Sequence, residues 1–405
     1  MSFLAYAGNF ALDTSTGTQA ITGVGFQPKA VIFLPTGATA NGAAEDLLYG
    51  IGVATAADNR WSVFGSSEGG QSTTDTSKGN KTDHCAYVAV PGSSSVNWSF
   101  DLDSMDADGF TIDITDAPSS AERCGFIAIG GADLLEVYAG YFAGTDSTGT
   151  QAITGVGFKP DAILFASPSI AALDSDWAGL CFSVGFTSGV GEDAATGIAS
   201  EDGETIVSDA ARRQTTSSCV FLISNSGSIS AEAHLDSFNA DGFTIDWTNA
   251  TGDEEYTFFL ALRGGQYKVG SLNTQTDLGV FAETGVGFKG SGIIVTGFCN
   301  ATSSSEIAGI RHSLGVATSS TQRFGVSAME EDAQATSDCD HGTRDNMLYT
   351  EYNYSRTGVS QLDFETWEDD GFTLDQAQAD PSAKEVLYFV MGSDVVSRRV
   401  FITHT

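Results

Sequence analysis

The chain has 405 residues, with 52 acidic and 18 basic side chains and a net charge of −34 at pH 7. A field of this sign repels nucleic-acid phosphates and anionic membranes, so we expect neither as a partner. It suits solubility in concentrated salt, where charges are strongly screened, and favours a salt-loving or marine source. No segment is long and apolar enough to span a bilayer, and the first residues lack the basic region and apolar core of a signal peptide.

Two sequence landmarks recur along the chain. The first, STGTQAITGVGF, ends at Phe26 and again at Phe158, and a shorter copy, TGVGF, ends at Phe288. The second is a turn that opens into a strand, and its copies are Asp106–Asp113, Asn239–Asp246 and Asp369–Asp375. Because the two shift together by about 130 residues, a domain-sized unit is present three times. We predict domains at 1–134, 135–266 and 267–396, and a short basic tail at 397–405.

Short β-forming runs follow one another through the first unit and recur in the others. The glycines of Gly-Val-Gly-Phe at 23–26 predict a bend between two strands. Residues 30–34 (AVIFL) are a continuous apolar run of strand length, whereas 96–104 (VNWSFDLDS) alternate as in a strand with one dry and one wet face. The stretch 35–47 differs between copies and is predicted to be a contact-bearing loop. Residues 66–83 form a polar segment.

This pattern predicts seven to nine short strands per unit and no helix. We therefore expect an all-β protein of three tandem antiparallel β-sandwich or jelly-roll-like domains. No linker rich in Pro or Ser separates the units, so they are expected to pack against each other. Three fused copies can place similar surfaces around a local threefold axis, which predicts a pseudo-threefold arrangement.

The cysteines and the acidic turns are the candidate metal ligands of the chain. The six cysteines show no CxxC spacing, which argues against a zinc site. Cys85 and Cys219 occupy matching positions, where the third unit has Met347, and this favours buried free thiols. Clustered carboxylates at the repeated turns could bind Ca²⁺, or could serve only as solvated turn residues. The calcium candidates are Asp103, Asp106, Asp108, Asp236, Asp241, Asp369 and Asp370.

Catalytic motifs are weak. Gly65–Gly69 fits GxSxG but has no predicted helix after it, as a nucleophile elbow requires. We predict no catalytic residue, no cofactor and no enzyme activity, with a polysaccharide-cleaving carboxylate pair as a remaining alternative. The interaction candidates are aromatic residues that could stack on sugars or anchor a protein contact, unless they pack beneath loops, and two tail arginines: Trp177, Tyr349, Tyr352, Arg398 and Arg399.

The phrase GTQAITGVGFQPKAVIF, followed by a DSxDxDGFTI turn and an apolar strand ending in Gly-Gly, resembles a module of predicted virion proteins of tailed phages and archaeal tailed viruses. The resemblance covers each unit nearly end to end, although the third unit matches weakly in the first landmark. It implies a part of the virion and carries no catalytic residues with it.

Together these features predict a non-enzymatic virion structural protein, assembled in the host cytoplasm. The first choice is a head-stabilising capsid decoration protein at a threefold or quasi-threefold position, attached to the major capsid protein or other virion proteins, with self-association as a further option. The tail could dock by strand addition or on an acidic neighbour. The alternatives are a tail or baseplate component, or a multivalent carbohydrate or receptor binder whose linked sites gain avidity.

Overall fold

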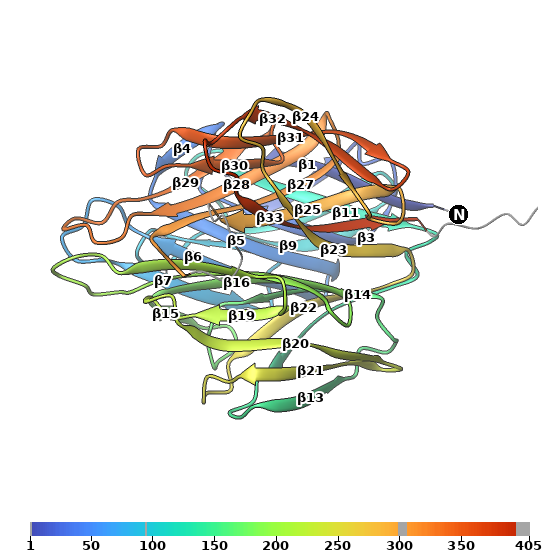
Figure 1. Ribbon diagram of the computed structural model, residues 1–405, viewed down its shortest axis with the longest axis horizontal. Helices are drawn as coiled ribbons and strands as arrows, with labels where there is room; N and C mark the ends of the chain where they lie inside the picture. The colour runs from blue at the N-terminus through green and yellow to red at the C-terminus, as the bar shows by residue number, and fades with distance from the viewer. Residues whose placement is uncertain (1, 94, 299–305, 394–405) are drawn as a thin grey trace, which may run out of the picture.

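The computed structural model describes residues 2–93, 95–298 and 306–393, and within them every regular element is a β-strand (Figure 1). The all-β class predicted from the sequence is therefore confirmed. The described strands follow a period of eleven, so that β1, β12 and β23 begin equivalent sets, which we call the first, second and third units.

The bounds of the strands are as follows. The first unit contains β1 (Phe3–Ala11), β2 (Gly17–Thr22), β3 (Pro28–Pro35), β4 (Gly42–Glu45), β5 (Leu47–Ala56), β6 (Asn59–Ser67), β7 (Thr76–Lys81), β8 (Ala86–Ala89), β9 (Val96–Asp106), β10 (Gly109–Asp116) and β11 (Arg123–Gly131). The second contains β12 (Glu136–Ala143), β13 (Gly149–Thr154), β14 (Ala162–Ser167), β15 (Asp176–Ala178), β16 (Leu180–Gly189), β17 (Glu192–Ser200), β18 (Ala210–Thr215), β19 (Val220–Ile223), β20 (Ile229–Asn239), β21 (Gly242–Asn249) and β22 (Tyr256–Arg263). The third contains β23 (Gln266–Asn273), β24 (Gly279–Thr284), β25 (Gly290–Phe298), β26 (Ile307–Ala308), β27 (Ile310–Ser319), β28 (Gln322–Glu330), β29 (Cys339–Arg344), β30 (Tyr349–Tyr352), β31 (Gly358–Glu368), β32 (Gly371–Gln378) and β33 (Glu385–Gly392).

Each unit pairs a small sheet with a large one. In the first unit the small sheet has the order β2-β10-β9-β8, and the large sheet has the order β1-β11-β3-β5-β6-β7-β15. The other units repeat both orders with their equivalent strands. The seventh strand of every large sheet comes from a different unit, as described below.

Each large sheet is buried on both faces, and the two faces pack into different hydrophobic cores. In β5, Leu47, Tyr49 and Ile51 belong to a core shared by the whole molecule, whereas Leu48 and Ala54 pack against the small sheet of the first unit. Side chains of successive strand residues point to opposite faces, so a strand buried on both sides must be apolar throughout. This explains the unbroken apolar run at residues 30–34.

The shared core joins the three units. Ile32, Leu164 and Ile294 occupy equivalent strand positions, are fully buried, and all belong to it. Three further cores, one per unit, lie between each large sheet and its own small sheet. Figure 1 shows the small sheets of the second and third units, with β13 and β24 at their edges, on opposite outer sides of the molecule.

Two sequence predictions need correction. Each unit has eleven described strands rather than seven to nine, and the additional ones are β1, β4 and β7 and their counterparts. β4 and β7 lie in segments without an apolar run and pair with strands of other units, whereas the apolar β1 pairs with β11 of its own unit. The residue equivalent to Cys85 and Cys219 is Leu348, not Met347, since the backbone N–H of each donates to the adjacent strand of the small sheet. The slot is apolar and buried in all three units, and the cysteines among the described residues are free and buried.

Candidate functional site at the junctions between units

The two repeated landmarks bind each other. The carboxylate of Asp108, at the second landmark, accepts hydrogen bonds from the N–H groups of Gly23 and Gly25 at 3.2 and 2.6 Å. Gly23 and Gly25 both have a φ of 85°, a left-handed conformation that side chains disfavour, and their N–H groups converge on one anion. Asp241 and Asp370 make the same pair of bonds in the other units. The two landmarks therefore recur together because each unit needs both of them to make this hydrogen-bonded contact.

The glycine after this aspartate is required by close packing. A Cβ on Gly109 would lie 2.0 Å from the carbonyl oxygen of Ile21, and Gly242 and Gly371 meet the equivalent carbonyl at 2.1 and 2.0 Å. Any side chain would push the first landmark away from the second.

The calcium candidates are spread over these turns and the adjoining strands. Asp108, Asp241 and Asp370 bind backbone N–H groups, while Asp103, Asp106 and Asp236 accept bonds from neighbouring hydroxyls. Asp369 is exposed beside Asp370. Within the described residues no three His, Cys, Asp or Glu side chains form a group that could hold a metal ion.

The variable loops exchange strands between units in a closed cycle. β15 of the second unit pairs with β7 of the first, β26 of the third pairs with β18 of the second, and β4 of the first pairs with β29 of the third. We call these the first, second and third junctions. Each unit thus gives one strand and receives one, so the third unit closes back onto the first.

The polar segments make a second set of hydrogen bonds between units. Thr74 inserts into a turn of the second unit: its hydroxyl donates to the Glu201 carbonyl at 2.8 Å and accepts from the Glu204 N–H at 2.9 Å. Its backbone also donates to Glu204 and accepts from Gly203. Ser208 makes the same four bonds to the third unit, and Ser337 makes them to the first.

We call these three residues the clasp hydroxyls. Their side chains are almost fully buried, so each bond replaces one that water would otherwise make. The clasps run in the opposite direction around the ring from the exchanged strands. Every junction is therefore held by one strand and one clasp hydroxyl contributed from opposite sides.

Three rings meet where the units converge. Tyr49, Phe182 and His312 are each the third residue of equivalent strands, β5, β16 and β27. The Tyr49 ring centroid lies 5.0 Å from that of Phe182 and 5.3 Å from that of His312. Contact among equivalent residues means that a pseudo-threefold axis passes between them. Burial lowers the pKa of His312 to about 3, so the imidazole is neutral.

A buried carboxyl breaks this symmetry. Glu330 ends β28, where the equivalent strands end in Ser67 and Ser200. It is fully buried, and its Oε1 accepts a hydrogen bond from the Ser200 hydroxyl at 2.5 Å. Burial raises the pKa of Glu330 to about 7, because ionisation would place a charge where water cannot reach it.

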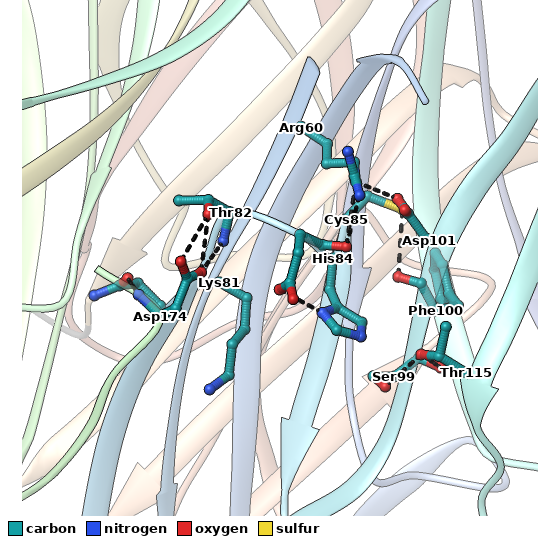
Figure 2. A network of polar contacts seen from close by, with 12 residues as sticks. Arg60, Lys81, Thr82, His84, Cys85, Ser99, Phe100, Asp101, Thr115 and Asp174 are labelled. Carbon is teal, nitrogen blue, oxygen red and sulfur yellow. Dashed lines mark hydrogen bonds and ion pairs between the residues drawn. The ribbon is translucent and has the colours of Figure 1, made fainter. Parts of the chain in front are cut away.

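The first junction has the polar network shown in Figure 2. Asp174, in the loop leading to β15, accepts hydrogen bonds from the backbone and the hydroxyl of Thr82 at 2.6 and 2.9 Å. Lys81 pairs with Asp176 of β15 at 3.1 Å. On the other side of this segment, Arg60 bonds both the Asp83 carbonyl and the Asp101 carboxylate. The contacts of Thr82 and Lys81 hold the exchanged strand on the first unit, while those of Arg60 order the adjoining segment within the first unit.

A pocket of about 430 Å³ opens on the other side of β15. Its walls come from both units: Lys78 belongs to the first, while Leu180, Cys181 and Asn225 belong to the second. We call it the junction pocket. Its remaining lining is rich in hydroxyl and carboxylate groups and comprises Ser169, Ala178, Gly179, Ala199, Ser200, Glu201, Asp202, Ile223, Ser224 and Ser230.

The predicted interaction residues differ in whether they are exposed or buried. Trp177 lies on β15 and is 46 % exposed, so it is available to a partner. Tyr349 and Tyr352 are buried, because β30 packs its side chains inside the third unit, so for these two the alternative of packing inside the protein holds and they are not surface contacts. Arg398 and Arg399, with the rest of the tail at 397–405, lie outside the described residues.

Two sequence features indicate parts of these junctions. The variability of residues 35–47 marked the loop that carries β4, and the odd Trp177 marked β15. The clasp hydroxyls were missed, since a lone Ser or Thr in a polar segment looks like any solvated residue. Alignment of the polar segments would have shown a hydroxyl recurring six or seven residues after Glu68, Glu201 and Glu331.

Comparisons with known proteins identify no family. No protein-family model matches the chain, and no curated protein matches it. Among solved structures, one similarity is to the Sulfolobus Turreted Icosahedral Virus, with a TM-score of 0.20 and 10% identity over 64% of this chain and 90% of that chain. Another is to fructofuranosidase from Schwanniomyces occidentalis complexed with fructose, with a TM-score of 0.12 and 7% identity over 93% and 100% of the two chains. At these TM-scores neither similarity informs function.

Within residues 2–93, 95–298 and 306–393, no helix has the length and apolarity needed to cross a membrane.

Proposed function

We propose that this protein is a structural component of a virion, and that it decorates the capsid of a tailed virus at a threefold or quasi-threefold position. It acts by contacts with the major capsid protein or a neighbouring virion protein, and performs no chemistry of its own. This extends the resemblance of its repeated sequence to virion modules of tailed viruses.

The observation that carries the proposal is the closed exchange of β4, β15 and β26. A single chain in which each unit grips the next is a ring of fixed geometry, and it presents three similar outer faces around one axis. Three capsid subunits around a threefold position present three similar surfaces in the same arrangement. One chain could therefore contact all three at once, with the gain in affinity that linked contacts give.

The charge of the chain also suits such a role. With a net charge of −34, the ring would associate with a basic patch on its neighbour, and this attraction would weaken as salt is added. The small sheets lie outermost, so their exposed faces and edges are available for contact.

Localisation in purified particles tests the proposal. Particles of the source virus would be separated into tailed particles and tail-free capsids, and both would be probed with antiserum raised against the full chain. The proposal predicts the protein in both fractions, in an amount proportional to the number of threefold positions. Detection only on tailed particles would place it in the tail or baseplate instead. Absence from both fractions would overturn a virion role.

A further inference from the structure

We propose that the junction pocket binds a short, uncharged saccharide. The inference does not rest on the proposed place in a virion. It rests on three features of the pocket: space that equivalent side chains fill in the other units, a lining of hydrogen-bonding groups, and an exposed indole beside it.

The space arises from a small side chain. Cys181 is the second residue of β16, and the equivalent residues of β5 and β27 are Leu48 and Arg311. Leu48 is nearly buried and packs closely on Gly37, where an added Cβ would lie 2.3 Å from its Cδ1. Arg311 pairs with Glu351 at 3.0 Å. In the second unit the thiol leaves this volume open.

A second position widens the same space. Asn225 lies in the turn after β19, and the equivalent residue in the third unit is Tyr354. Tyr354 lies beneath the Arg311 guanidinium, 5.5 Å from it, and closes over Gly309. The shorter Asn225 cannot reach so far. The pocket is thus a consequence of two substitutions between copies of one unit.

The polar lining offers both donors and acceptors. The Lys78 ammonium lines the pocket, interacts electrostatically with Cys181 and Glu255, and can donate hydrogen bonds into the pocket. The Asn225 side-chain nitrogen donates to Glu201 and Asp209, which leaves its oxygen as an acceptor. The lining hydroxyls of Ser224 and Ser230 can do either. Such a mixture matches the several hydroxyls of a sugar better than it matches an apolar ligand.

Trp177 supplies an apolar surface at the rim. It is directly opposite Lys78 in the pairing of β15 with β7, and residues paired in this way carry their side chains on the same face of the sheet. The indole therefore lies beside the Lys78 side chain that lines the pocket. A flat aromatic ring next to hydrogen-bonding groups suits the C–H face and the hydroxyl edge of a pyranose ring.

The charge of the site selects against acidic sugars. Two carboxylates, Glu201 and Asp202, line the pocket with one lysine, and the whole chain is strongly negative. A sialic acid or sulfated sugar would meet repulsion both locally and at a distance. A neutral saccharide avoids this cost, and a volume of about 430 Å³ is within the range of small-molecule sites.

The pocket is held rigid by the junction. Its Glu201–Asp202 wall is fixed by the clasp at Thr74 and by the Thr76 N–H, which donates to Asp202 at 2.8 Å. Its Trp177 rim is fixed by the pairing of β15. A preformed site loses little side-chain entropy on binding. Among the described residues this pocket is formed at the first junction, so strong attachment to a glycan surface would need many chains side by side.

Binding to neutral sugars tests the proposal directly. The full chain would be titrated with neutral trisaccharides of glucose, mannose, galactose and N-acetylglucosamine, and with sialyllactose as the charged comparison. Tryptophan emission and saturation-transfer NMR would follow binding, since Trp177 is the exposed tryptophan of the described chain. We expect at least one neutral trisaccharide to bind at millimolar concentration and to perturb the emission, and sialyllactose not to bind.

Two variants locate the site. Cys181→Leu places in the pocket the residue that the first unit already accommodates, and it should weaken binding at least about tenfold while the melting temperature is retained. Trp177→Ala should also weaken binding. Tyr141→Ala removes a comparably exposed aromatic ring outside the pocket and should leave binding unchanged. Failure of every neutral trisaccharide to bind, or full binding by either pocket variant, would overturn the proposal.

Discussion

At the scale of single residues, three aspartates hold the repeated sequence together. Asp108 bonds to Gly23, 85 residues earlier in the chain, and its counterparts Asp241 and Asp370 do the same. The sequence predicts an Asp-Gly turn and a glycine bend separately. It could not predict that one binds the other, because nothing local links positions so far apart.

Asp108→Ala should destabilise the first unit. The substitution removes a charged acceptor from two backbone N–H groups, and we expect a loss of about 1 kcal/mol in the free energy of unfolding, because the site is exposed and water can replace part of the interaction. Urea unfolding followed by circular dichroism would measure it. Asp103→Ala, at an exposed carboxylate bonded only to the next serine, should cost less than about 0.5 kcal/mol. Equal losses in the two variants would contradict this role for Asp108.

Glu330 should make stability depend on pH near neutrality. Its pKa is 4.5 when exposed and about 7 in the folded chain, so folding favours the protonated form. The stability it contributes is complete below pH 4.5 and is lost as pH rises to about 7, a change of about 3 kcal/mol. Asp193 and Asp340, whose pKa values burial raises to about 6, add to the same trend.

The comparison with Glu330→Gln isolates this residue. The variant should lose less stability than the wild type between pH 5 and pH 8, as measured by melting temperature across that range. Glu331→Gln, at the partly exposed neighbour, should follow the wild-type curve. A Glu330→Gln curve parallel to that of the wild type would show that the carboxyl does not titrate in this range.

At the scale of elements, the junctions depend on residues with no apolar pattern. Ser337 is held by Glu68, Gly70 and Gln71 of the first unit through four hydrogen bonds. Strand β4 pairs with β29, about 300 residues away along the chain. Whether Ser337 is buried and whether β4 forms a strand therefore depend on contacts between units and not on the local sequence pattern.

Ser337→Ala should loosen the third junction. Removing the hydroxyl leaves the Gln71 N–H and the Glu68 carbonyl without this buried partner, at an expected cost of about 1–3 kcal/mol. Ser208→Ala should cost a similar amount, because the second clasp has the same geometry. Ser355→Ala, at an exposed serine of the third unit, is the control and should be nearly neutral. Chemical denaturation of the three variants would decide, and a neutral Ser337→Ala would contradict the clasp.

The strands and the junctions differ in how far the local sequence predicts them. The alternation at residues 96–104 and the apolar run at 30–34 predicted strands β9 and β3 correctly, because burial leaves its period in the residues themselves. For the tyrosines at 349 and 352 the sequence left exposure and burial open, because Tyr has both a polar hydroxyl and an apolar ring, and the structure buries them. The junction pocket could not have been predicted at all, because it depends on side chains from two units.

At the scale of the molecule, the repeat predicted three copies packed together, and the structure adds the form of that packing. Every large sheet contributes one face to a core that all units share. A unit taken alone would expose that face and lose its exchanged strand. We therefore regard the ring, rather than the single sandwich, as the unit that folds.

Calorimetry of the full chain tests this ring most directly. If the three units share one core and close on each other, unfolding should be a single transition. Its van't Hoff enthalpy should then equal the calorimetric enthalpy, roughly 280 kcal/mol near 60 °C for a chain of this length. Three resolved transitions, or a van't Hoff enthalpy about one third of the calorimetric value, would show independent sandwiches and contradict the closed ring.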